Sequence, residues 1–174
     1  MARTIVPTTV EKFFHADDII VSKTDLKGRI TYANATFCAV AEYREDELLG
    51  QPHSIIRHPD MPRSVFKLLW DTLAEGREVF AYVKNMTRNG HFYWVFAHVT
   101  PSFGADRQVI SFHSNRRVPS RRILTEAIIP LYAELLREEA SHRNGKDALA
   151  AGCARLAAFT KAKGMPYEQL VFSL

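Results

Sequence analysis

The densest group of side chains that can bind a polar ligand lies in residues 50–62, Gly-Gln-Pro-His-Ser-Ile-Ile-Arg-His-Pro-Asp-Met-Pro. The prolines near the end of this segment disfavour a continuous helix, because proline fixes φ and restricts the residue before it. We therefore expect a stiff, irregular loop that carries Arg57, His58 and Asp60. A cation, an imidazole and a carboxylate held in this way offer a ligand both hydrogen-bond donors and an acceptor.

The same residues also allow an interpretation in which they have a purely structural role. Arg57 and Asp60 would then pair with each other and cap the helix that is expected to begin near Arg63. The residue types alone do not distinguish ligand binding from this structural role, so both remain expectations.

Aromatic residues favour a pocket for a planar cofactor within reach of this loop. They lie on an expected helix and an expected central strand, at Phe66, Trp70, Trp94 and Phe96. Apolar walls with a few directed polar groups are typical of cofactor sites. Asn34 and Asn85 add amide donors and acceptors, although Asn34 is also placed to cap a helix. The alternative is that each aromatic residue is an ordinary part of the core.

Catalytic and metal-binding motifs do not appear in the sequence. Zinc needs closely grouped Cys and His ligands, whereas the seven histidines are scattered and Cys38 and Cys153 lie far apart. The sequence has no glycine-rich phosphate loop, no Gly-x-Ser-x-Gly element and no evident pair of nucleophile and base. Isolated histidines in a sheet are more often packed or exposed than haem ligands, which applies to His58, His91, His98 and His113. The residues therefore favour a binding protein over an enzyme.

The composition is that of one soluble domain with an appendage. The chain has 174 residues, of which 47% are hydrophobic and 24% are charged. The sequence shows neither an N-terminal apolar signal nor a run of about 18 apolar residues. Two distant cysteines fit a reducing compartment. We therefore expect a cytoplasmic protein that does not enter a membrane.

The net charge of +4 is concentrated near the C-terminus. Residues 116–163 carry 10 Lys and Arg against 5 Asp and Glu, whereas the rest of the chain carries 13 against 14. This excess is compatible with an acidic protein partner. It does not favour nucleic acid, because the charges are spread around expected helices and such faces are usually solvated.

Local patterns predict an α+β fold in which short helices separate two groups of strands. A short amphipathic helix over 7–15 is expected to cover the domain or to contact a dimer partner. The other elements are strands over 18–24 and 29–33, helices over 34–40, 43–49 and 64–73, and strands over 79–86, 91–100 and 108–115. Asn89-Gly90 is a strong hairpin signal. Consecutive hairpin strands form an antiparallel sheet, and helices grouped in mid-chain cover one face of it.

The character of the sequence changes at Pro119. A long amphipathic helix is predicted over 121–139 with a kink at Pro130, and an alanine-rich helix over 147–163, before an apolar tail over 167–174. We therefore divide the chain into an N-terminal cap segment (1–16), a sensor domain (17–118) and a C-terminal helical extension (119–174). The two helices of the extension serve either as an output or dimer surface or only as cover for the sheet.

Two stretches carry a resemblance to a known family. The strand-turn-strand of residues 24–34, Thr-Asp-Leu-Lys-Gly-Arg-Ile-Thr-Tyr-Ala-Asn, resembles a PAS domain. The sensory PAS domains of the bacterial aerotaxis transducer family are similar to residues 50–62 together with Phe66, Trp70, Val83-Lys-Asn85, Arg88-Asn-Gly90 and Tyr93-Trp94. The similarity covers residues 17–118. It implies a PAS fold, with a five-stranded antiparallel sheet and short helices on one face.

The resemblance implies a function as well. Aerotaxis PAS domains bind FAD without a covalent bond and read cellular redox state. The matching positions become candidate FAD contacts, namely Arg57, His58, Asp60, Trp70 and Asn85, with Asn34 and Phe66 beside them and Trp94 added from the aromatic set. Arg57 and His58 would meet oxygens of the cofactor, and Trp70 would form an aromatic wall. Asn85 would pair with the pyrimidine edge of the flavin, and Asp60 would orient Arg57 and His58.

Two departures from the family shape the expected output. The transducers continue into a membrane anchor and a signalling domain, whereas this chain ends in two helices and a short tail. We therefore expect the redox signal to pass to a partner signalling protein or through a homodimer. The flavin-reactive Asn-Cys-Arg-Phe run of light-sensing relatives is absent and Cys38 lies on an earlier helix, so adduct photochemistry is not expected. A haem-binding gas sensor and a cofactor-free interaction module remain as alternatives.

Overall fold

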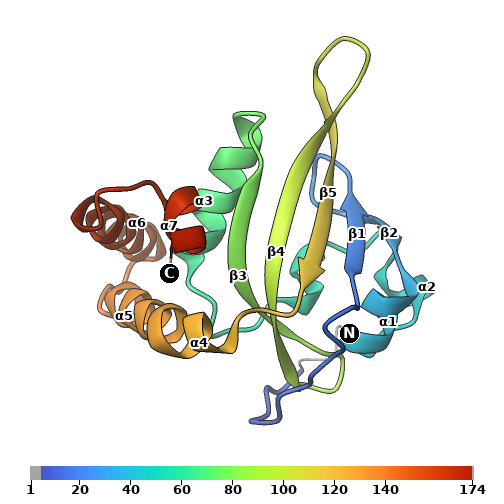
Figure 1. Ribbon diagram of the computed structural model, residues 1–174, viewed down its shortest axis with the longest axis horizontal. Helices are drawn as coiled ribbons and strands as arrows, with labels where there is room; N and C mark the ends of the chain where they lie inside the picture. Colours follow the sequence, from blue (N-terminus) through green and yellow to red (C-terminus); the bar gives the residue numbers. More distant parts are fainter. Residues whose placement is uncertain (1–4, 174) are drawn as a thin grey trace.

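Five strands form one antiparallel sheet in the computed structural model, which describes residues 5–173 (Figure 1). The strands are β1 (Ile20–Thr24), β2 (Ile30–Ala33), β3 (Val79–Met86), β4 (Phe92–Phe103) and β5 (Val109–Arg117). Their order across the sheet is β2-β1-β5-β4-β3, so the first and last strands of the chain are neighbours at its centre. The predicted α+β class and five-stranded antiparallel sheet are confirmed.

The hairpin of β3 and β4 follows from its turn residues. Gly90 has a φ of +85°, which L-residues rarely adopt, and the amide of Thr87 donates to the carbonyl of His91 at 2.7 Å. Asn85 is thereby paired with Tyr93, and Val83 with Val95, along one face of the sheet. The observed β4 continues three residues beyond the predicted end at Thr100, and β5 continues to Arg117.

Four short helical elements lie between β2 and β3 and cover one face of the sheet. They are α1 (Ala35–Ala41), α2 (Glu45–Leu48), the 3₁₀ turn η1 (His53–Ile56) and α3 (Arg63–Ala74). The expected N-cap of α1 is confirmed, since the Asn34 side-chain oxygen accepts from the amide of Phe37 at 2.9 Å. The helix α3 is amphipathic, and its buried face, which includes Val65, Leu69 and Leu73, packs towards the sheet.

The predicted helix over residues 7–15 is wrong. This segment runs alongside the start of β4, where Thr8 N donates to Gly90 O at 2.8 Å and Lys12 N donates to Phe92 O at 2.7 Å. Backbone groups that pair with a strand are not available for helical hydrogen bonds. Phe14 packs against the core, whereas Phe13 is 72% exposed and lies under the guanidinium of Arg121. Residues 1–4 of the predicted cap lie outside the described residues.

The C-terminal extension contains α4 (Arg121–Ile123), the π-helical turn η2 (Leu124–Ile128), α5 (Ile129–Ala140), α6 (Gly145–Ala162) and α7 (Tyr167–Ser173). The helix predicted over 121–139 is therefore interrupted by a widened turn just before Pro130. Proline has no amide hydrogen for the carbonyl one turn earlier, which explains why the irregularity lies there. The apolar tail forms the helix α7, which the sequence reading did not assign.

The C-terminal helices enclose the β3 edge of the sheet (Figure 1). On the face opposite α3, the Tyr132 hydroxyl of α5 donates to the carbonyl of Tyr82 at 2.6 Å, and Phe172 of α7 packs edge-on against Phe80. The helix α6 packs against α3 on the other side. Both faces of β3 and β4 are therefore covered, and the core continues from the domain into the extension. No helix within residues 5–173 is both long and apolar enough to cross a membrane.

Candidate functional site

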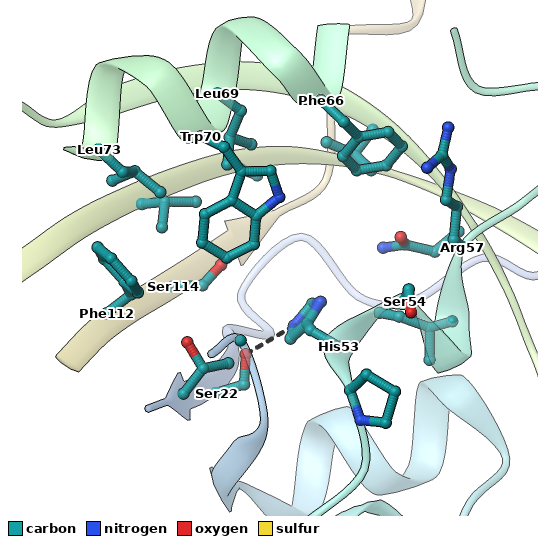
Figure 2. A pocket seen from close by; sticks show the side chains of 18 of the residues that line it. Ser22, His53, Ser54, Arg57, Phe66, Leu69, Trp70, Leu73, Phe112 and Ser114 are labelled. Carbon is teal, nitrogen blue, oxygen red and sulfur yellow. Dashed lines mark hydrogen bonds between the residues drawn. The ribbon is translucent and has the colours of Figure 1, made fainter. Parts of the chain in front are cut away.

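A cavity of about 460 Å³ lies between α3, the turn η1 and the concave face of the sheet (Figure 2). Side chains alternate between the two faces of a strand. On β3, β4 and β5 this alternation directs Asn85, Ala97 and Phe112 towards the cavity. The volume lies within the range typical of small-molecule sites.

Aromatic rings form the wall that α3 contributes. Trp70 extends from the helix towards the sheet and packs edge-on against Phe112, with ring centroids 5.6 Å apart (Figure 2). Its indole also reaches the turn between β1 and β2, where an added side chain at Gly28 would meet the ring at 3.3 Å. Trp70 is nevertheless 41% exposed, so much of its apolar surface is free to contact a ligand. Phe66, one turn earlier, lines the same cavity.

Arg57 closes one side of the cavity. Its guanidinium lies 4.3 Å from the centroid of the Phe66 ring, and its backbone bridges to Asn85 of β3. Burial and the nearby charge of Arg63 lower the pKa of Arg57. A guanidinium over the face of an aromatic ring can still donate hydrogen bonds from its N–H groups. Arg57 can therefore donate hydrogen bonds to a ligand in the cavity.

The interpretation in which Arg57 pairs with Asp60 and has only a structural role is wrong. Asp60 accepts instead from the Lys84 ammonium at 2.7 Å. The N-terminus of α3 is capped by Glu139 of α5, whose carboxylate accepts from the amide of Ser64 at 2.9 Å. Arg57 therefore neither pairs with Asp60 nor caps α3.

His58 and Asp60 hold the loop rather than border the cavity. His58 is buried, its Nδ1 accepts from the amide of Asp60 at 3.1 Å, and its ring lies edge-on to Phe92. Burial and the charge of Lys84 lower the pKa of His58. Both side chains lie on the Lys84 side of the loop, so the structure does not bring them together with Trp70.

Asn34 and Trp94 also lie away from the cavity. The Asn34 side chain is occupied by the backbone, because its Nδ2 donates to Ile19 O at 2.8 Å in addition to its capping bond. Trp94 faces Tyr132 of α5 on the opposite side of the sheet, with ring centroids 6.1 Å apart. The expected grouping of Trp94 and Phe96 with the α3 aromatics is therefore wrong. Of the eight predicted site residues, the cavity is lined by Arg57, Phe66, Trp70 and Asn85.

Sequence reasoning missed the polar floor of the cavity, which consists of Ser22, His53 and Arg116. Ser22 Oγ lies 3.1 Å from His53 Nε2 (Figure 2) and accepts from Arg116 Nη2 at 2.6 Å. Burial and the charge of Arg116 lower the pKa of His53 to about 3, so its imidazole is neutral near pH 7. Burial lowers the pKa of Arg116 to about 10, which leaves it charged at that pH. The floor thus carries one positive charge.

The available signal for this floor was weak. Arg116 lies just past the strand end expected at Asn115, and Ser22 is a small polar residue in an apolar strand. The floor combines three segments that are distant in sequence. Within residues 5–173, no group of three His, Cys, Asp or Glu side chains is arranged to hold a metal ion, and neither cysteine lines the cavity.

Comparisons with known proteins identify relatives of this chain. The family described as "PAS fold" matches residues 30–116. The aerotaxis receptor of Escherichia coli K12 is 39% identical over 127 residues, which is 73% of this chain and 25% of the receptor. The nitrogen fixation regulatory protein of Klebsiella pneumoniae is 25% identical over 122 residues, or 64% of this chain and 25% of that protein. The chain thus spans about a quarter of the length of these relatives.

Solved structures share the fold at low sequence identity. The dark-state LOV domain of the blue-light photoreceptor Aureochrome1 has a TM-score of 0.57 at 18% identity, and the similarity covers 66% of this chain and 86% of that one. An RNA-binding light-oxygen-voltage receptor has a TM-score of 0.58 at 18% identity, over 73% of this chain and 37% of that one. The sequence match over residues 30–116 and the shared fold together establish that this chain belongs to the PAS family.

Proposed function

We propose that this chain is a PAS sensor that binds FAD without a covalent bond and relays the redox state of the flavin. The observation that carries the proposal is the cavity, which has aromatic walls on one side and unpaired donors at its floor. The similarity to an aerotaxis receptor supports a role in signal transduction. The resemblance to aerotaxis PAS domains supports FAD as the ligand.

The two ends of the cavity match the two edges of an isoalloxazine ring. This ring system has an apolar edge that carries methyl groups and a polar edge that carries carbonyl oxygens and ring nitrogens. Trp70, Leu73 and Phe112 supply an apolar lining. Asn85 and the Ser22–His53–Arg116 floor supply polar groups for the other edge. Bound FAD would provide a ring that accepts electrons reversibly.

A neighbouring cleft supports a dinucleotide rather than a smaller flavin. It is more open than the first cavity, and Ser54, Arg57 and Arg63 border both spaces. Arginine side chains are well suited to phosphate oxygens. We therefore assign the pyrophosphate of FAD to the boundary between the two spaces and the adenosine to the open cleft.

The predicted site residues take different parts in this proposal. Arg57, Phe66, Trp70 and Asn85 contact the cofactor. His58 and Asp60 hold the loop from which Arg57 extends, and Asp60 does so through Lys84. Asn34 and Trp94 stabilise the sheet on which the cavity is built.

The output of the sensor is proposed to pass through the C-terminal extension. The cavity wall α3 packs against α6, and Glu139 of α5 caps its N-terminus. Oxidised and reduced flavin must stabilise different arrangements of these elements for a signal to exist. The chain is proposed to act without catalytic turnover in the cytoplasm, as a homodimer or on a chemoreceptor-type or kinase-type partner. Neither nucleic acid nor a membrane is part of the proposal.

The absorption spectrum of the purified protein before and after dithionite tests the proposal. We expect flavin bands in the oxidised protein that bleach on reduction, and FAD rather than FMN on chromatography of the released cofactor. A Soret band would assign the cavity to haem and a gas sensor instead. A spectrum that stays featureless after incubation with FAD and dialysis would leave a protein-interaction module.

A further inference from the structure

Arg116 is a buried cation without a carboxylate partner. The residue is 2% exposed, and within residues 5–173 no Asp or Glu forms an ion pair with it. Its Nη2 donates to Ser22 Oγ at 2.6 Å, but Nε and Nη1 have no hydrogen-bond partner in the described part of the chain. A charge that is buried without pairing is costly, and proteins seldom retain one without a reason.

The surroundings of Arg116 do not neutralise its charge. The guanidinium lies 4.3 Å from the centroid of the Phe37 ring, which favours a cation but removes no charge. His53 shares Ser22 with it and is neutral near pH 7. The hydroxyl of Thr24, another residue of the cavity lining, is also buried and without a partner. Both Arg116 and Thr24 belong to the residues that line the cavity, so a ligand held there lies beside a buried, unneutralised charge.

We propose that Arg116 is the counter-cation for negative charge that the ligand acquires on reduction, and that it sets the preference of the cavity for reduced over oxidised flavin. This inference rests on the proposed function and adds to it the residue that tunes the redox potential. A flavin ring that takes up two electrons from a reductant and one proton from water gains one negative charge. Arg116 keeps its own proton, and its positive charge at the cavity lining favours the negative charge on the reduced ring.

Substitutions at Arg116 and at the adjacent Arg117 distinguish this role from a general effect of removing a positive charge. Arg117 follows Arg116 in β5, but its side chain is exposed and points to the other face of the sheet. Arg116→Met removes the buried charge and keeps an unbranched apolar chain. Arg116→Gln keeps hydrogen-bond donors without the charge, and Arg116→Lys keeps the charge. Arg117→Met is the matched control.

Spectroelectrochemical titration of the FAD-loaded proteins measures the preference directly. We expect R116M and R116Q to lose at least tenfold in affinity for reduced relative to oxidised flavin, which lowers the midpoint potential by about 30 mV for a two-electron couple. R116K and R117M should stay within threefold of the wild type. Unchanged midpoint potentials in R116M and R116Q would overturn the proposal while leaving FAD binding intact. A protein that takes up no flavin overturns both this inference and the proposed function.

Thermal unfolding of the cofactor-free proteins supplies a second, independent readout. If Arg116 is retained for a ligand, R116M without cofactor should unfold at the same temperature as the wild type or higher, because it removes an unpaired buried charge. Bound FAD should then raise the unfolding temperature of the wild type more than that of R116M. A cofactor-free R116M that unfolds well below the wild type would show a structural role and overturn the proposal.

Discussion

Glu139 of α5 is the side chain through which the C-terminal extension holds the cavity helix α3. It is 8% exposed, and its carboxylate accepts from Arg63 N at 3.0 Å, Ser64 N at 2.9 Å and Ser64 Oγ at 2.8 Å. Pro62 contributes no side-chain cap, so the first turn of α3 depends on a residue 75 positions away in the sequence. Replacing Glu139 with alanine tests whether this contact between the extension and α3 contributes to the stability of the folded protein.

The expected cost follows from these contacts. Loss of a capping side chain costs about 0.5–2 kcal/mol, and a hydrogen bond to a charged group contributes about 1.5–3 kcal/mol. Because Ser64 is fully buried, water does not replace the lost acceptor at its amide. We therefore expect E139A to lower the free energy of unfolding by about 2–4 kcal/mol, which for a protein of this size lowers the melting temperature by about 6–12 °C.

Glu138→Ala is the control, since Glu138 is the adjacent residue of the same helix and, within residues 5–173, its carboxylate is paired only with the partly exposed His142 at 3.4 Å. This variant should lose less than about 1 kcal/mol. Differential scanning calorimetry compares the two. Equal melting temperatures for E139A and E138A would refute the reasoning, because they would show that the cap contributes no more than a surface carboxylate.

Gly152→Ala provides an internal check on the same contact. A Cβ at Gly152 of α6 would lie 2.7 Å from Glu139 Oε1 and 2.8 Å from its Cγ, so it must displace the carboxylate. We expect G152A to destabilise the wild type but to cost much less in the E139A background. Strictly additive effects in this double-mutant cycle would show that the two residues do not act on each other.

Three further predictions concern the cavity and its frame. Trp70→Ala should weaken FAD binding at least tenfold by fluorescence titration, because an aromatic contact contributes about 0.5–1.5 kcal/mol beyond the energy of the buried area. Phe103→Ala is the control, since it removes an exposed aromatic side chain outside the cavity lining, and it should leave the affinity unchanged. His53 has a pKa of about 3 in the folded protein, below its unfolded value, so its effect on stability is constant above about pH 6.5 and the folded state loses stability as the pH falls from there towards 3. Urea unfolding at pH 7.5 and pH 5 should therefore show His53→Gln gaining about 1–2 kcal/mol relative to the wild type at the lower pH, and an identical difference at both pH values would contradict this assignment. Asn34→Ala should lower the free energy of unfolding by about 1–2 kcal/mol with FAD affinity within twofold of the wild type; a large loss of affinity in a folded variant would instead restore Asn34 as a cofactor contact.

The sequence predicted those elements whose signals are local. Asn89-Gly90 locates the β3–β4 hairpin because Gly90 readily adopts the positive φ that this turn requires. The cap at Asn34 is likewise fixed by the residue itself and the three that follow it. Both features depend on contacts within a few positions of the chain.

Trp94 shows where local patterns fail. Alternation along β4 predicts two faces, but it does not say which face lies towards α3. Both faces of this strand are apolar because α5 and α7 cover the one that α3 does not. The prediction for the N-terminal segment fails for a related reason: the apolar pattern over residues 7–15 fits a helix, but the backbone groups of this segment pair with β4 instead. In both cases a distant element decided the outcome.

The floor of the cavity was beyond sequence reasoning for the same physical cause. Ser22 and Arg116 are 94 positions apart and meet only because β1 and β5 are neighbours in the sheet. Arg57, Trp70 and Asn85 were found because their residue types and the family resemblance singled them out individually. A contact among distant residues has no signature in one sequence, even when each residue is conspicuous by itself.

The segment that forms one side of the cavity also pairs with both edge strands of the sheet. At its start, the amide of Ile30 in the edge strand β2 donates to Gln51 O, and the amide of Gly50 donates to Ile30 O, both at 2.8 Å. At its end, Arg57 bridges to Asn85 in the other edge strand, β3. Open strand edges invite the addition of a foreign strand and aggregation. Here one short segment occupies backbone groups on both edge strands, so a ligand that shifts the segment acts on the two edges together.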